Sequence, residues 1–193
     1  QLEIAGITTL LARQRSGAHK ASGTIVVNGH TFGVQLTYLD DNTAGSGVVT
    51  AGGTRGDALL DQGTVYLRGD TDFWSALGVT GTPPPPPGWV NIGDLLQGKL
   101  FYPPAKWTAA LAPTPAARLD GSRYTVGPNS ATITNASDIT HYSVNDVDVD
   151  VTAAQPPDVL AAATQLGADH GPGAPLSRTA AGGWTLTAPA PPA

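Results

Sequence analysis

The sequence predicts an α+β domain, a curved and mostly antiparallel β-sheet with helices packed on one face. Two patterns lead to this fold class. Segments with apolar residues at every second position recur between turn signals at intervals of about 8–12 residues, as in an antiparallel meander. Segments with apolar residues at helical spacing lie near both ends of the chain. Because 193 residues is the length of one domain, we take residues 1–193 as a single unit.

The first predicted elements are a helix and a β-hairpin. Residues 2–15 place apolar side chains at helical spacing and end in Ser16-Gly17, which predicts an amphipathic helix. Residues 24–27 and 30–39 then flank Asn28-Gly29. This pair suits a type I′ turn, in which both central residues need a positive φ, so the two segments are predicted to pair.

Further strands and a short helix follow. Residues 45–51, 58–60 and 64–68 are short apolar segments between Gly- and Asp-rich turns, and each is predicted to be a strand. After them the period changes, and Asp70 or Thr71 is in position to cap a short helix that carries Phe73, Trp74 and Leu77.

A proline-rich loop is predicted at residues 80–88. It holds five consecutive prolines, which favour an extended polyproline II conformation and suit either an exposed spacer or a motif for a proline-binding domain. If the loop recruits a partner, the candidate contacts are Pro83, Pro84, Pro85, Pro86, Pro87 and an exposed Trp89.

The second half of the chain alternates in the same way. A helix is predicted at 105–112 behind Pro103-Pro104, since proline is tolerated in the first turn of a helix. The strands predicted next are 123–126, 131–134 and 140–152, the last with Val147, Val149 and Val151 on one face and Asp146, Asp148 and Asp150 on the other.

The chain then ends on a helix, a loop and a strand. Pro156-Pro157 opens the helix, which Gly167 closes and in which Val159, Leu160, Ala163 and Leu166 are expected to point inward. A loop is expected at 168–176, a final strand at 184–187 and a frayed tail at 188–193.

Composition excludes several classes of protein. The net charge of −5 and the ten Lys and Arg residues disfavour a nucleic-acid binder, which needs a basic surface. The sequence contains no run of about 18 apolar residues that would predict a membrane span. Because the chain has no cysteine, thiolate metal sites and cysteine nucleophiles are excluded.

Motifs for catalysis or metal binding are absent from the sequence. The Asp146, Asp148 and Asp150 row has the spacing of a strand rather than of a calcium loop, and the four histidines are scattered and expected to be exposed polar residues. No Gly-x-Ser-x-Gly elbow and no phosphate-binding loop occurs. We therefore predict no catalytic residue, no metal and no cofactor, and a protein that is not an enzyme.

The aromatic and aliphatic residues suggest a different kind of site. Large rings beside small Ala and Gly residues either close into a core or leave an apolar cavity of lipid size, and the residues alone leave both open. The candidate wall residues for such a cavity are Phe32, Val34, Leu36, Tyr38, Val65, Leu67, Phe73, Trp74, Trp107 and Leu111.

Two stretches resemble a known family. A leading helix followed by SGTIVVNGHTFGVQLTYL, and the strand-to-helix stretch VYLRGDTDFW at 65–74, resemble the LppX/LprG-type lipoproteins of mycobacteria. The resemblance is best over residues 4–78. It implies a half-barrel whose concave face encloses an apolar cavity for acylated lipids, and a location outside the plasma membrane. The anchoring cysteine of the family is not in this chain, so the resemblance also implies peripheral attachment through an anchor that this sequence lacks.

Two functions follow as expectations. The first is a non-catalytic, extracytoplasmic protein of an actinobacterial cell envelope that binds or transfers an acylated lipid or lipoglycan. The alternative is an adaptor or structural domain of a membrane-anchored envelope protein, which docks on a transporter or an assembly protein.

Overall fold

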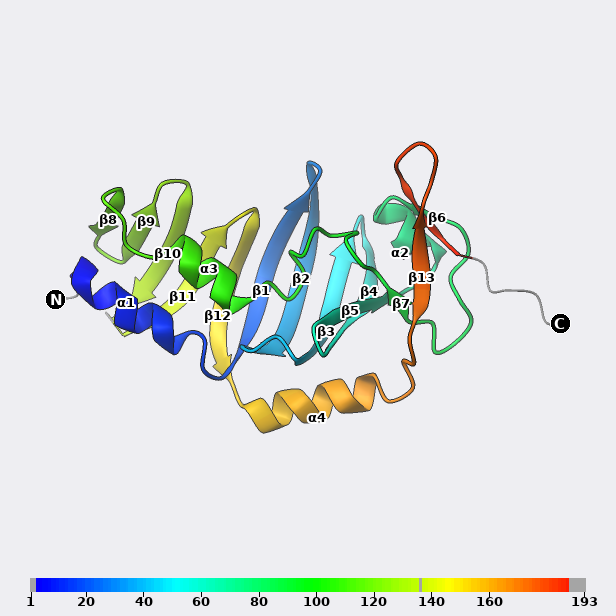
Figure 1. The fold of residues 1–193 in the computed structure, drawn as a ribbon, viewed down its shortest axis with the longest axis horizontal. Helices are drawn as coiled ribbons and strands as arrows, with labels where there is room; N and C mark the ends of the chain where they lie inside the picture. Colours follow the sequence, from blue (N-terminus) through cyan, green and yellow to red (C-terminus); the bar gives the residue numbers. More distant parts are fainter. Residues whose placement is uncertain (1–2, 136, 188–193) are drawn as a thin grey trace.

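The chain folds around one fourteen-stranded sheet (Figure 1). The computed structural model describes residues 3–135 and 137–187, so the predicted tail at 188–193 lies outside the described residues. The helices are α1 (Ile4–Arg13), α2 (Thr71–Ala76), α3 (Pro104–Ala110) and α4 (Pro156–Leu166). The strands are β1 (Ala18–Val27), β2 (His30–Leu39), β3 (Ala44–Ala51), β4 (Thr54–Asp61), β5 (Thr64–Arg68), β6 (Val79–Thr80), β7 (Val90–Asn91), β8 (Ala117–Asp120), β9 (Arg123–Val126), β10 (Asn129–Thr134), β11 (Asp138–Val144), β12 (Val147–Ala154), β13 (Ala174–Arg178) and β14 (Trp184–Leu186).

The predicted fold class is confirmed. The strand order is β6-β14-β13-β7-β5-β4-β3-β2-β1-β12-β11-β10-β9-β8, and neighbouring strands are antiparallel except for β13 beside β7 and β14 beside β6. The first hairpin has the predicted turn, with φ of 51° at Asn28 and 78° at Gly29. Asp70 caps α2, because its carboxylate accepts a hydrogen bond of 2.9 Å from the Phe73 backbone N–H.

The prediction of one strand at 140–152 is wrong, because the structure has two strands there. β11 and β12 form a hairpin whose turn residues Asn145 and Asp146 have φ of 52° and 62°. Asn and Asp tolerate this left-handed region better than other residues with a side chain. The turn removes Asp146 from the predicted aspartate row and leaves Asp148 and Asp150 on the exposed face of β12.

The two halves of the sheet meet along β1 and β12. Ala18 pairs with Ala154 and Ile25 with Val147, so the first strand of the chain lies between its own hairpin partner β2 and the late strand β12. At this junction Gly23 lies directly against β12, where a Cβ atom would come within 2.1 Å of the Asp148 carbonyl oxygen. The close approach of the two backbones therefore depends on a glycine.

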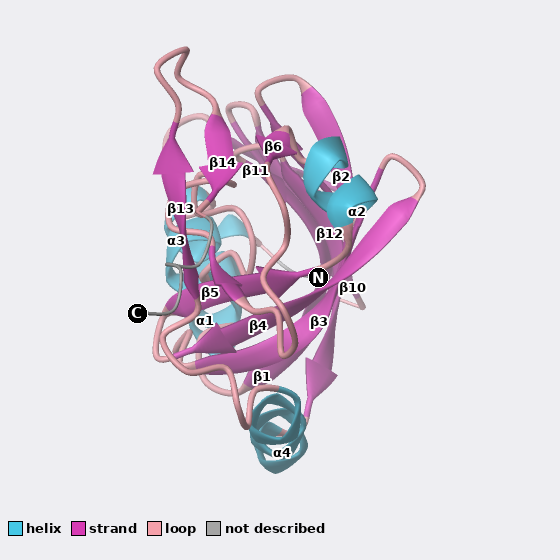
Figure 2. Cartoon of the chain, turned by 90° about the vertical axis from the view of Figure 1, so that its right-hand side faces the viewer, coloured by secondary structure: helices cyan, strands magenta, loops and turns pink. Residues whose placement is uncertain are grey.

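The sheet buries apolar residues on both faces. The larger cluster covers the concave face and contains residues of α1, α2 and α3, among them Ile7, Phe73 and Trp107. On the opposite face a smaller cluster contains Leu59 of β4 and Ala163 of α4. Figure 2 shows α4 beneath the sheet, away from α1 and α3. The helices are thus divided between the faces, so the expectation that they pack on one face holds for α1, α2 and α3 but not for α4, which covers the second face.

Four local expectations need correction. Leu160 was expected to point inward from α4 but is 52% exposed, because only Val159 and Ala163 of that helix reach the sheet deeply. The region predicted as a loop at 168–176 contains the start of β13, which pairs with β7. β8 was not predicted, and the strand predicted at 58–60 is longer, because β4 begins at Thr54.

An aromatic group lies beneath α3. The rings of Trp107 and Tyr142 stack with centroids 4.4 Å apart and planes 12° apart, and the Tyr38 hydroxyl donates a hydrogen bond of 2.7 Å to the Tyr102 carbonyl oxygen. Burial raises the pKa of Tyr38 above its usual value of 10.0. Burial, and then the neighbouring Tyr38, also raise the pKa of Tyr142 well above that value. Both phenols are therefore held in the neutral form.

We predict a loss of stability in alkaline solution. A raised pKa means that the folded state keeps these protons after the unfolded state has released them. The stabilisation is therefore complete below pH 10 and is lost as the pH rises above it. Thermal unfolding followed by circular dichroism between about pH 7 and pH 11 should show a constant Tm and then a fall. Tyr142→Phe should make that fall shallower, and an equal fall in the variant and the wild type would contradict the assignment.

Candidate functional site

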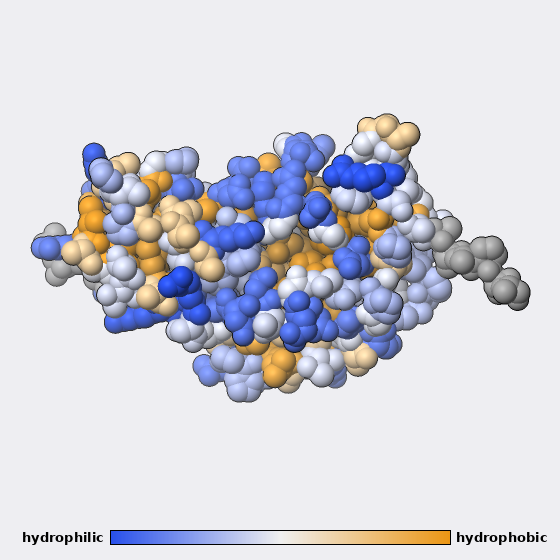
Figure 3. Space-filling view, in the orientation of Figure 1, coloured by the Kyte–Doolittle hydropathy of each residue, from blue (hydrophilic) through white to orange (hydrophobic). Residues whose placement is uncertain are grey.

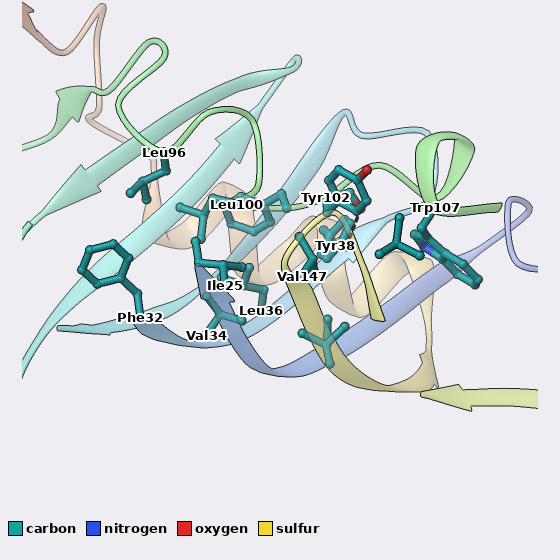
Figure 4. Packing of buried hydrophobic residues seen from close by; sticks show 14 of the residues in the cluster. Ile25, Phe32, Val34, Leu36, Tyr38, Leu96, Leu100, Tyr102, Trp107 and Val147 are labelled. Atoms are coloured by element: carbon teal, nitrogen blue, oxygen red, sulfur yellow. Dashed lines mark hydrogen bonds between the residues drawn. The ribbon is translucent and has the colours of Figure 1, made fainter. Parts of the chain in front are cut away.

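The predicted wall residues lie on the concave face. All ten belong to the larger cluster or pack against it, and Val65 is the one that is only partly buried. They come from β2, β5, α2 and the region of α3, so the fold brings together residues that are far apart in the sequence. Figure 4 shows Phe32, Val34, Leu36, Tyr38 and Trp107 of this set, with side chains of other segments beside them.

A segment of the same chain covers this face. Residues 92–102, here called the strap, follow β7 and cross the concave side of the sheet in irregular conformation before α3 begins (Figure 1). Leu95, Leu96, Leu100 and Phe101 of the strap are all buried in the larger cluster. In Figure 4 the side chains of Leu96 and Leu100 lie beside Phe32 and Ile25. The strap thus supplies the apolar contacts that the sheet face requires.

Four side-chain contacts fix the strap to the sheet and its turns, and the Ile92 backbone N–H also donates to the Val65 carbonyl oxygen at 3.2 Å. The Lys99 ammonium donates to the Val26 carbonyl oxygen at 2.7 Å and lies 3.5 Å from the Asp146 carboxylate. The other three contacts are the Tyr38 hydroxyl on the Tyr102 carbonyl oxygen, the Asn42 amide on the Phe101 carbonyl oxygen at 2.9 Å, and the Gln97 amide on Asn28 Oδ1 at 3.2 Å. Few hydrogen bonds hold the strap, so side-chain packing carries most of its attachment.

An open cleft lies at one end of the strap. It has a volume of about 620 Å³ and is bordered by the β1–β2 turn, the end of α2, the strap and the β13–β14 hairpin. We call it the rim cleft. Its lining residues are Val27, Asn28, His30, Phe32, Leu77, Gly78, Asp94, Leu95, Leu96, Gln97, Arg178, Gly182, Gly183 and Trp184.

The rim cleft has an apolar floor and a polar edge. Phe32, Leu77 and Leu96 form part of the floor and are themselves buried in the larger cluster, so the floor is continuous with the core. In Figure 3 hydrophobic residues reach the surface in the middle and towards both ends of this side of the molecule. A site with this division suits a ligand that has an apolar part and a polar part.

Charges of both signs stand at the edge of the cleft. The Arg178 guanidinium lies 4.1 Å from the centre of the Trp184 ring and donates a hydrogen bond of 3.0 Å to the Gly182 carbonyl oxygen. Both contacts hold Arg178 on the hairpin that borders the cleft. Asp94 and His30 stand on other segments of the edge. The edge can therefore hydrogen-bond the polar group of a ligand, and that group does not need a large net charge.

The proline loop differs from its expected form. The five prolines do not form one extended run, because the chain bends at Pro85 and turns at Pro86-Pro87. Pro85, Pro86 and Pro87 are exposed, whereas Pro83 and Pro84 are half-buried. The expectation that Trp89 is exposed was wrong. It is 2% exposed and packs in the smaller cluster, with the Arg68 guanidinium 4.3 Å from its ring centre.

Three of the four histidines were wrongly expected to be merely exposed. His19 Nδ1 lies 2.7 Å from the buried Asp40 carboxylate, and His170 Nε2 lies 2.7 Å from Asp61. His141 reaches Asp148 at 2.7 Å and Asp150 at 2.8 Å. Within residues 3–135 and 137–187 no group of three or more His, Asp or Glu side chains is arranged to hold a metal ion. These three histidines therefore act as hydrogen-bond partners of carboxylates and tie strands and loops together.

Comparison of the chain with protein-family models, curated proteins and solved structures found no match. In the part of the chain that the structure describes, no helix has the length and apolar character needed to cross a membrane.

We predict that Lys99 controls the local stability of the strap. Lys99→Met keeps the buried methylene chain but leaves the Val26 carbonyl oxygen without this donor, which should cost about 1–3 kcal/mol. Amide hydrogen exchange should then quicken at residues 97–101 before it does so in β1 and β2. Asp146→Asn is the matched control, because the Asp146 side chain is 65% exposed and its ion pair should contribute less than about 1 kcal/mol. Equal acceleration over the whole sheet would contradict a strap that opens locally.

Proposed function

We propose that this protein is a non-catalytic binding and transfer protein for an acylated lipid or lipoglycan. The observation that carries the proposal is the rim cleft, whose polar edge stands over an apolar floor that runs into the concave core. Following the family resemblance, we propose that it acts outside the plasma membrane, in an actinobacterial cell envelope. In this proposal the ligand's polar group lies at the edge and its acyl chain lies on the floor.

The strap gives this proposal a physical mechanism. Leu95 and Leu96 belong both to the strap and to the lining of the rim cleft, so an acyl chain on the floor would lie against the strap. Burial of each methylene group contributes about 0.8 kcal/mol. An acyl chain that entered further would replace the contacts that Leu100 and Phe101 now make with the sheet, so the ligand would cover the apolar area that the strap uncovers. Binding is thus a competition between two apolar occupants of one face.

We predict that narrowing the rim cleft from its edge weakens ligand binding. His30 is exposed and lines the cleft, and a tryptophan suits its position at the start of β2. His30→Trp should therefore keep the fold and weaken the binding of a fluorophore-labelled palmitate about tenfold or more. Thr31→Trp is the matched control, because Thr31 is the next residue, equally exposed, and does not line the cleft. Fluorescence titration of the wild type and both variants measures the effect.

Two results would overturn the proposal. Equal weakening by both tryptophans would show that the probe binds elsewhere, and an absence of binding to the wild type would remove the basis for a lipid ligand. Circular dichroism on each variant verifies that the fold is intact.

A protein partner is the second candidate, and the exposure of Pro85, Pro86 and Pro87 favours it. In that case replacing these three prolines with serine should abolish the interaction with the transporter or assembly protein. The same variant should bind the labelled palmitate like the wild type, because the proline loop does not line the rim cleft.

A further inference from the structure

The convex face of the sheet carries a second open site. Beyond the part that α4 covers, a groove of about 520 Å³ crosses strands β1 to β4, and we call it the convex groove. Its lining residues are Ser22, Gly23, Gly33, Val34, Gln35, Val48, Thr50 and Arg55. It lies on the opposite side of the sheet from the rim cleft, because Gly33 and Gln35 alternate along β2 with the buried Phe32, Val34 and Leu36.

Strand register aligns the lining in two transverse rows. One row runs Thr24, Gly33, Thr50, Arg55, and the next runs Ser22, Gln35, Val48, Asp57, each through directly paired residues. Thr50 Oγ1 lies over Gly33, where a Cβ atom would come within 2.2 Å of it. The absence of a side chain at Gly33 therefore lets the Thr50 hydroxyl reach across from β3 to β2 in the groove.

The polar groups of the convex groove are available to a ligand. Within the described ranges, 3–135 and 137–187, no hydrogen bond joins the side chains of Ser22, Gln35, Thr50 or Arg55 to another protein group. Of the charged groups beside the groove, Asp57 pairs with Arg68 at 2.8 Å, Asp148 and Asp150 lie within hydrogen-bond distance of His141, and Lys20 is exposed two residues before Ser22 on the same face of β1. What faces solvent in the groove is a set of neutral hydroxyl and amide groups with a single guanidinium at one end.

We propose that the convex groove binds an uncharged glycan chain. Hydroxyl and amide side chains both donate and accept hydrogen bonds, which matches the paired donor and acceptor character of sugar hydroxyls. Val48 adds a small apolar surface for the C–H face of a sugar ring. Three antiparallel strand spacings measure about 14 Å, which gives room for two or three sugar units across the sheet. This site is independent of the lipid proposal, because no residue lines both openings.

The test uses backbone amide NMR spectra of the whole chain. Maltotetraose, cellotetraose and laminaritetraose are added separately, and at least one of them should shift the amides of Ser22, Gln35 and Thr50 in a saturable way. Thr50→Val and Gln35→Ala should each weaken that binding about fivefold, the effect of losing one hydrogen bond. Thr152→Val is the matched control, because Thr152 is also an exposed threonine of a strand on the convex face but lies outside the groove.

Three outcomes would overturn the proposal. The first is that none of the three oligosaccharides shifts these amides. The second is that Thr50→Val and Gln35→Ala bind as tightly as Thr152→Val. The third is that inorganic phosphate produces the same shifts as the sugar and Arg55→Gln abolishes them, which would make the groove an anion site. The amide spectrum of each variant also reports whether its fold is unchanged, so a misfolded variant is recognised and replaced by Ser22→Ala.

Discussion

The need to cover the concave face of a large curved sheet governs the rest of this structure. Fourteen strands present a wide apolar surface, and the three helices on that side are short. Exposed apolar area of this size is unfavourable in water, so further chain must lie on it. The strap covers part of this surface with leucine and aromatic side chains, although it has no regular secondary structure. Gln97 and Phe101 of the strap have a positive φ, a backbone conformation that residues with a side chain seldom adopt.

This arrangement links stability to binding. A face that is covered by a helix bundle would be permanently closed, whereas the strap is held by side-chain packing and a few hydrogen bonds from β1, β2 and the β2–β3 turn. The contacts that stabilise the folded chain are then the same contacts that an acyl chain would replace. The two faces of the sheet also differ in chemistry, since the concave side offers apolar area and the convex side offers hydroxyl and amide groups.

Elements defined by local chemistry were predictable from the sequence. Asn28-Gly29 specifies its turn by backbone preference, and Asp70 specifies the start of α2 by capping. The turn at Asn145-Asp146 also depends on the backbone preference of its residues. It was not predicted, because Val and Asp alternate regularly beside it as they would in one continuous strand. β8 and β13 carry little apolar periodicity, and β13 is a strand because β7 and β14 are there to pair with it. The burial of Trp89 likewise depends on Arg68 and the smaller cluster, which only the fold brings together.

The seam between β1 and β12 has a consequence for how the chain reaches this state. β1 forms its hairpin with β2 from neighbouring residues, but its other edge is completed only when Ala154 arrives opposite Ala18. Until then β1, an inner strand of the finished sheet, has an open edge that can pair with any other strand it meets. Closing a loop of that length is entropically slow, so folding should be limited by this one junction rather than by the local hairpins. A chain that stops short of β12 would leave one edge of β1 exposed, and the last third of the sequence therefore decides whether the first third remains soluble.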